Sequence, residues 1–270
     1  MIPVMHLSLA LYLSWLGILG LGLCNAVLVV WRKLYQRLPW LLAYLAVSSG
    51  YGAILWLLQP RVSQRTYQEA YWIHQLALLV ITMLLVYSFW KVGLAKYRGL
   101  HLLCAGVLLS TFVVELLVVL FTSRSGPSIA LTSANWMNQW LFLFYRSGMF
   151  VAAGLLCAFF GLVHFFQIPV TRATRGLALG LSLFALAHVV LDSWTYLMGM
   201  PSLLILNSLH FASALLLHTL WFVTIVRYRA NEPLETTPTL DVRASPEDLD
   251  RQMEAINLAL LRLTGSRGPK

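Results

Sequence analysis

The sequence predicts an all-α membrane protein: a bundle of seven transmembrane helices followed by a short cytoplasmic tail. Of its 270 residues, 59% are hydrophobic and 11% are charged, whereas soluble domains have about 25% charged residues. In addition, the apolar residues gather in runs of about 20, the length at which a helix crosses the hydrocarbon core. The strands of a membrane barrel would give runs of about 10 residues, so that architecture is excluded.

Seven runs meet the length of a membrane-spanning helix. The N-terminus lacks the basic region of a cleavable signal peptide, so we expect the first run to remain as a span. All three cysteines lie inside apolar runs, which predicts packing roles and no disulfide framework. The expected spans are 5–31, 39–58, 71–93, 101–121, 137–165, 176–199 and 203–226.

The distribution of Lys and Arg predicts how this bundle is oriented. The formal net charge of +9 arises before residue 227, because the last 44 residues carry seven basic and seven acidic side chains. Ten basic residues flank the spans on one side, and three lie on the other. Because basic loops stay in the cytoplasm, we expect a multi-pass inner (plasma) membrane protein with its N-terminus outside and its C-terminus inside. The lipid bilayer is therefore the expected partner of this charge, and nucleic acid is not.

Several ionisable residues interrupt the apolar runs. An intramembrane charge costs at least about 2.5 kcal/mol on insertion scales, so these residues indicate a functional site. With a helix rise of roughly 1.5 Å per residue, five of them lie roughly 9 to 17 Å below one boundary of the bundle. Residues three or four apart share a helical face, as in two pairs here. The predicted ligand-binding set is Glu115 and Arg146, the pair His188 and Asp192, and the pair Asn207 and His210.

Three interpretations of this layer are open. Arg146, Glu115 and Asp192 can form a buried ion triad that fixes helix packing, because paired charges are tolerated in lipid. The same layer can instead be an outward-facing pocket in which Arg146 anchors an anionic ligand. The third interpretation is a metal or single-haem site. A retinal Schiff base is excluded, because the last span contains no lysine.

The histidines allow a closer test of the metal interpretation. His188, Asp192, His210 and His218 are of the residue types that bind zinc, and they resemble the ligand types of the seven-helix zinc hydrolases of the ceramidase and progestin-receptor-like superfamily. That superfamily has two histidines four residues apart on its last helix, whereas His210 and His218 are eight apart. The resemblance is therefore one of residue types alone.

The last residues form a separate unit after the bundle of residues 1–229. A polar linker occupies 230–244, and the tail 245–270 contains a predicted amphipathic helix over 246–264 with Ser245 as N-cap. So short a helix is marginal in water, so we expect its apolar seam to pack on the inner loops of the chain, on a second copy or on another protein. The predicted docking residues are Leu249, Met253, Ile256, Leu260 and Leu263.

Loop and interface residues also resemble those of a known family. The stretch 32–40, the pair Tyr71-Trp72 and the stretch 97–100 resemble an uncharacterised bacterial family of seven-helix membrane proteins, over about residues 10–195. No activity is known for that family, so the resemblance implies topology and adds nothing catalytic. From the residues, we expect a protein without enzymatic activity or cofactor, either sensor-like or a partner-binding subunit. The alternative is an intramembrane metal-dependent hydrolase that uses the histidines and Asp192.

Overall fold

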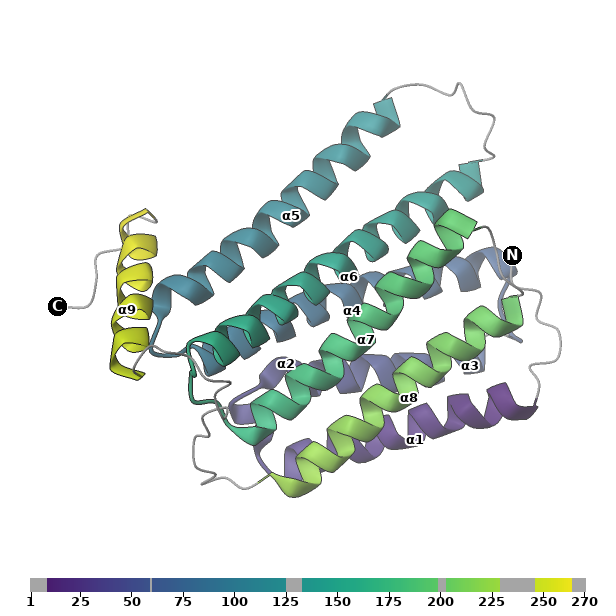
Figure 1. Ribbon diagram of the computed structural model, residues 1–270. Helices are drawn as coiled ribbons and strands as arrows, with labels where there is room; N and C mark the ends of the chain where they lie inside the picture. The colour runs from purple at the N-terminus through teal and green to yellow at the C-terminus, as the bar shows by residue number, and fades with distance from the viewer. Residues whose placement is uncertain (1–8, 59, 125–132, 199–202, 229–245, 264–270) are drawn as a thin grey trace.

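The protein is helical throughout the part that the structure describes. The computed structural model describes residues 9–58, 60–124, 133–198, 203–228 and 246–263. Helices account for nearly all of these residues, and no strand occurs among them (Figure 1). The predicted all-α class is therefore confirmed. In the same part of the chain, five helices are long and apolar enough to cross a membrane, which indicates a membrane protein.

These five helices form one bundle and match the first, third, fifth, sixth and seventh expected spans. In the bundle, α4 packs on α6, α6 on α7, α7 on α8, and α8 on α1 (Figure 1). The first and last spans of the bundle therefore lie side by side. The helices are α1 (Leu9–Trp31), α4 (Gln64–Gly93), α6 (Ser133–Phe165), α7 (Arg172–Met198) and α8 (Leu203–Arg227).

The other two expected spans are shorter as apolar helices. The expected span 39–58 is divided into α2 (Pro39–Ala46), the π-helix η2 (Val47–Tyr51) and α3 (Gly52–Leu58). In η2 the Ser48 hydroxyl donates to the carbonyl of Leu45 at 3.3 Å, the type of local bond with which serine competes with the helix ladder. The expected span 101–121 lies in α5 (Arg98–Arg124). Its apolar stretch 98–114, like 39–55, is 10–17 residues long, so the count of seven spans stays a prediction.

Local signals explain where several helices begin and end. The helix α4 begins at Gln64 and not at residue 71 because Ser63 is its N-cap, with the Ser63 hydroxyl accepting from the Thr66 N–H at 3.2 Å. The helices α1 and α6 are followed by Lys33 and Gln167, whose φ angles are 55° and 52°. Left-handed residues of this kind commonly end helices. Because α4 begins at Gln64, most of the segment 59–70 between the second and third expected spans is helical.

The helices α7 and α8 pack closely because two glycines of α7 face side chains of α8. A Cβ atom at Gly180 would lie 2.9 Å from the Trp221 ring, and one at Gly176 would lie 2.6 Å from the Thr224 hydroxyl. Such small residues allow neighbouring membrane helices to approach. The buried Trp221 indole N–H donates to the Leu177 carbonyl at 2.9 Å. This contact fixes the relative position of the two helices that carry most of the predicted site.

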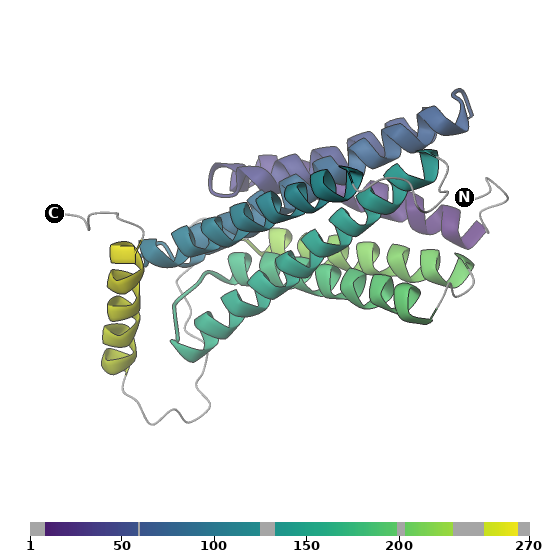
Figure 2. The same cartoon turned by 90° about the horizontal axis from the view of Figure 1, so that it is seen from above.

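The tail helix packs on the same chain. The helix α9 (Pro246–Leu263) matches the expected range 246–264 within one residue and crosses the beginning of α5 (Figures 1 and 2). Asp250 accepts hydrogen bonds from Lys96 Nζ at 2.6 Å and from the Tyr97 hydroxyl. Asn257 Oδ1 accepts from the backbone N–H of Gly99. In the structure, α9 therefore packs on the chain itself, which is one of the three expected docking surfaces.

The buried face of α9 differs from the predicted seam. Met253 is fully buried and Leu260 packs against the core, as expected. Ile256, however, is 42% exposed, so it is not part of the face that packs on α5, and its docking role stays a prediction. The polar contacts of Asp250 and Asn257 set the rotation of the helix, and apolar spacing alone does not contain them. The side chains of Leu249 and Leu263 lie outside the described residues.

Candidate metal centre

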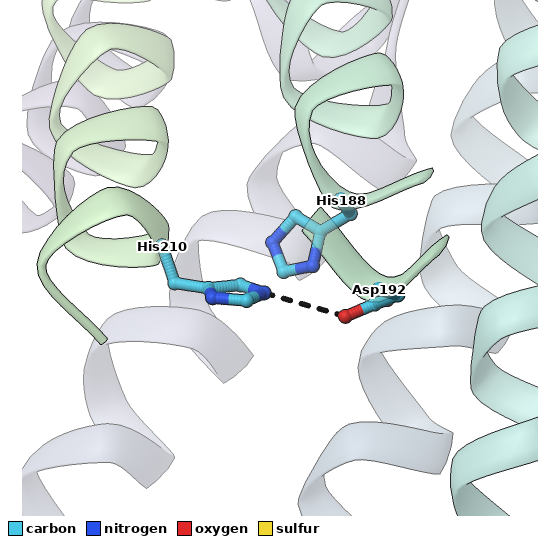
Figure 3. Close-up of side chains that lie close together, drawn as sticks. All are labelled: His188, Asp192 and His210. Carbon is cyan, nitrogen blue, oxygen red and sulfur yellow. Dashed lines mark ion pairs between the residues drawn. The ribbon is translucent and has the colours of Figure 1, made fainter. Parts of the chain in front are cut away.

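Three of the predicted site residues converge between α7 and α8. His188 and Asp192 lie on one face of α7, as their four-residue spacing predicts, and His210 faces them from α8 (Figure 3). One ligand atom from each residue lies within 4.8 Å of the other two. His188 is 9% exposed and Asp192 is 5% exposed. These three residues, which we term the α7–α8 cluster, have the ligand types and proximity of a metal centre.

The hydrogen bonds of His210 determine which of its ring nitrogens faces the cluster. His210 Nδ1 lies 2.9 Å from the carbonyl oxygen of Leu206, one turn earlier on α8. A carbonyl oxygen can only accept, so Nδ1 carries a proton and donates it there. In the neutral ring Nε2 then presents its lone pair toward Asp192. Metal-bound histidines are typically oriented in this way, by a carbonyl or carboxylate that holds the second ring nitrogen.

The separation of His210 and Asp192 suits a bridging ion better than a direct hydrogen bond. His210 Nε2 and Asp192 Oδ1 are 3.5 Å apart, which is longer than the usual range for hydrogen bonds. Two ligand atoms that each lie about 2.0–2.2 Å from a tetrahedral zinc ion are about 3.4 Å apart. The observed distance is therefore close to the one that a shared metal ion requires.

Two buried polar atoms of the α7–α8 cluster lack a hydrogen-bond partner. These atoms are His188 Nδ1 and Asp192 Oδ2, and no described residue forms a hydrogen bond with either of them. Buried polar atoms are nearly always paired, and leaving one unpaired is costly. The His188 ring is enclosed by aromatic rings, with centroid distances of 4.4 Å to Phe184 and 5.9 Å to Tyr145. The cluster thus has free bonding capacity beside aromatic rings.

Arg146 contacts α7 at the residue that follows Asp192. Its Nη2 atom donates to the Ser193 hydroxyl at 3.4 Å, and Ser193 directly follows Asp192 on α7. The guanidinium also stacks over the Phe150 ring at 5.8 Å. Asp192 Oδ1 lies 3.5 Å from His210 Nε2, and this contact is an ion pair only when the His210 ring is protonated. Glu115 lies on α5 and Asn207 on α8, but their side chains lie outside the described residues, so the predicted triad with Glu115 stays a prediction.

His218, the fourth predicted zinc ligand, lies elsewhere. It is buried against α1, where the Asn25 side-chain amide donates to the His218 carbonyl at 2.9 Å. A Cβ atom at Gly22 would lie 3.5 Å from its ring. Eight residues move a side chain roughly 12 Å along a helix, so His218 is far below His210. Its inclusion in the metal-ligand set is therefore wrong.

The sequence analysis missed two neighbours of the site. Ser193 accepts from Arg146, and Tyr145 contacts His188 with its ring edge. Each directly adjoins a residue that was identified by its charge. Neither has a periodic or charge signal of its own, because serine and tyrosine are common in membrane helices. Adjacency to Arg146 and Asp192 is the signal that could have found them.

The fold and the cluster define a class: a helical protein of membrane type with two histidines and one carboxylate gathered at a buried point. Comparison with protein families, with curated proteins and with solved structures finds no match. The functional argument therefore depends on the geometry of the α7–α8 cluster.

Proposed function

We propose that the chain is a sensor- or receptor-like protein that binds a divalent transition-metal ion at His188, Asp192 and His210. The supporting observation is the convergence of three ligand atoms within 4.8 Å from two helices. Imidazole nitrogens suit zinc, copper, iron and nickel, and a carboxylate completes a common ligand set for zinc and ferrous iron. Zinc is the natural first probe because it has no redox chemistry and accepts this ligand set.

The proposed setting is a seven-span bundle in the inner membrane, with the N-terminus outside and the C-terminus inside. The five membrane-length helices and the ten basic residues on one side support it. In this orientation the α7–α8 cluster lies in the outer half of the bundle and α9 lies in the cytoplasm. An ion that arrives from outside would thus meet the site before it reached the middle of the membrane.

The sensor-like part of the proposal rests on the position of α9, which follows the last span and packs on the beginning of α5. In the proposed orientation α9 lies in the cytoplasm, where it can pass a change in the bundle to a protein partner or to a second copy of the chain. The exposed face of α9, which includes Ile256 and Leu258, is available for such a contact while its other face packs on α5.

Metal analysis of purified variants tests the proposal. We expect one zinc ion per chain in the purified protein after zinc loading and removal of free metal. Asp192→Asn and His210→Gln should each lose this ion, because each removes a ligand. His218→Gln is the matched control, since it replaces a buried histidine of the same helix outside the cluster. Metal that is equally retained in all three variants would contradict the proposal.

A metal-dependent hydrolase is a second candidate. One observation favours it: three protein ligands leave one position of a tetrahedral ion open, as in catalytic zinc sites, where a water molecule occupies it. The discriminating measurement is turnover of ester-bearing and amide-bearing lipid probes by the zinc-loaded protein. Turnover that disappears on chelation and in Asp192→Asn would favour the hydrolase, and its absence favours the sensor-like protein.

A further inference from the structure

The helix α5 begins without a capping residue of its own. The segment 94–97, which precedes it, contains none of the Ser, Thr, Asp or Asn residues that usually cap the first N–H groups of a helix. The helices α4 and α7, by contrast, are capped from their own sequence. Ser63 caps α4, and the Thr171 hydroxyl caps α7 by accepting from the Thr174 N–H at 3.2 Å. The start of α5 therefore needs an acceptor from another part of the chain.

The tail helix α9 supplies this acceptor. Asn257 Oδ1 accepts a hydrogen bond from the N–H of Gly99, which is the second residue of α5. A capping side chain commonly accepts from this position of a helix. Asparagine also weakens the interior of a helix that contains it. The place of Asn257 in the middle of α9 is therefore explained by its bond to α5 and not by the stability of α9.

Gly99 makes the start of α5 depend further on α9. Glycine is one of the weakest helix formers, because it loses the most backbone freedom on folding. Its lack of a side chain is required here, since a Cβ atom at Gly99 would lie 2.7 Å from the Asn257 carbonyl oxygen. The same residue thus weakens the first turn of α5 and allows the backbone of α9 to approach it.

Further contacts hold α9 across the beginning of α5 (Figures 1 and 2). Asp250 accepts from Lys96 Nζ at 2.6 Å and from the Tyr97 hydroxyl, so its carboxylate lies beside the residues that lead into α5. A negative charge near the first turn of a helix stabilises that helix. Met253 of α9 is fully buried. Docking of α9 thus brings both a cap and a negative charge to the start of α5.

We infer that α9 is a detachable cap of α5: the first turn of α5 is formed while α9 is docked and unwinds when α9 leaves. Docking of α9 and folding of this turn are then one coupled equilibrium. Unwinding would lengthen the connection 94–97 between α4 and α5. A partner that takes α9 would therefore change α5 as well. This coupling goes beyond the proposed metal site and does not depend on it.

Hydrogen exchange of leucine amides measures both sides of the coupling. The experiment uses the full-length, metal-free protein in detergent at constant pH, labelled with ¹⁵N-leucine. Leu100 and Leu102 report on the start of α5, and Leu258 and Leu260 report on α9. Asn257→Ala removes the cap. We expect exchange to become about fivefold faster at all four amides, which corresponds to the loss of about 1 kcal/mol with a capping residue.

Three further variants test the coupling. Asn257→Asp retains an acceptor and should exchange like the unmodified protein, because aspartate and asparagine cap equally well. Gln252→Ala is the matched control, since it removes an exposed side-chain amide of α9 and should change nothing. Met253→Ala removes a fully buried side chain and leaves the capping residue in place. It should nevertheless accelerate exchange at Leu100 and Leu102, because it weakens the docking of α9.

The outcomes decide between a coupled cap and a simple contact. Faster exchange of both α5 and α9 in Asn257→Ala and in Met253→Ala supports the coupled cap. Faster exchange of α9 with unchanged exchange at Leu100 and Leu102 overturns it, because α9 would then rest on a turn that is stable by itself. Unchanged exchange of α9 in Asn257→Ala also overturns it. The metal site is tested separately by metal content, so failure of one proposal leaves the other in place.

Discussion

The α7–α8 cluster and the contact between α9 and α5 are both polar, but they differ in how their polar groups are satisfied. In the contact between α9 and α5, Asp250 meets Lys96 and Tyr97, and Asn257 meets the Gly99 N–H. In the cluster, His188 Nδ1 and Asp192 Oδ2 have no hydrogen-bond partner among the described residues. A polar contact that satisfies its own groups holds a structure together, whereas convergent groups with free bonding capacity can receive a ligand.

The largest expected effect is on stability in the presence of metal. Zinc at about 100 times its Kd should raise the free energy of unfolding by about 2.7 kcal/mol, because it binds only the folded cluster. Asp192→Asn should abolish this gain. Thermal unfolding in detergent, with and without zinc, measures it. The interpretation of the cluster fails if zinc stabilises Asp192→Asn as much as the unmodified protein.

A substitution at Gly99 should disrupt the contact between α9 and α5. A Cβ atom there would lie 2.7 Å from the Asn257 carbonyl oxygen and 2.9 Å from Leu260 Cβ. Overpacking of this kind costs about 1–3 kcal/mol, so Gly99→Ala should detach α9. Hydrogen exchange of the α9 amides should become faster. Gly106→Ala on the same helix is the control, since no atom lies within 4 Å of its added Cβ.

The contact between α9 and α5 should also depend on pH. Hydrogen bonds from Lys96 and Tyr97 lower the pKa of Asp250 below its ordinary value of 3.8. Protonation is therefore less favourable in the docked state, so Asp250 stabilises docking above about pH 4 and this contribution disappears as the pH falls through its lowered pKa. Exchange of the α9 amides as a function of pH measures the loss.

Two carboxylate variants of α9 distinguish this titration from a general acid effect. At neutral pH, the α9 amides of Asp250→Asn should be protected, relative to their intrinsic exchange rates, to nearly the degree that the unmodified protein shows in acid. Asp248→Asn should keep the original pH profile, because the Asp248 ion pair with Arg251, at 3.9 Å, lies within α9 itself. An identical profile in both variants would assign the pH dependence to another group.

The smallest effect is expected at buried histidines that stand alone. His74 is buried, its Nδ1 lacks a partner among the described residues, and its ring stacks on Tyr51 at 4.9 Å. His74→Phe retains the ring and removes the unpaired nitrogen, so the stability should change by about 1 kcal/mol or less. Zinc content should not change. Loss of zinc in His74→Phe would show that convergence of ligand atoms does not distinguish metal-binding histidines from histidines that only pack.

Part of the candidate site could be predicted from spacing along single helices. His188 and Asp192 share a face because four residues make about one helical turn. The identity of their partner could not be predicted, because His210 and His218 are equally apolar in their surroundings and lie on the same helix. The approach of α7 to α8 at Gly180 and Trp221 decides which histidine faces Asp192. Spacing along one helix contains no information on how a second helix is shifted past it.

In the tail, too, local signals predict the helix, whereas contacts with another helix decide which face is buried. Its helix is predicted within one residue, because Ser245, Pro246 and the following acidic residues are local start signals. Met253 and Leu260 of the predicted seam face the rest of the chain, whereas Ile256 is exposed, because Asn257 takes a polar partner from α5. The spacing of apolar residues along a helix cannot predict a hydrogen bond to another element.

The amino-acid sequence by itself determined the helical class, the apolar length of the main spans and the charge asymmetry between their ends. These properties follow from the solvent preference of each residue and from local helix geometry, so they need no knowledge of neighbours. Only the tertiary structure decided which polar side chains meet: His210 with Asp192, Arg146 with Ser193, and Asn257 with Gly99. Those pairings depend on the axial shift and rotation of packed helices, which close contact between side chains sets.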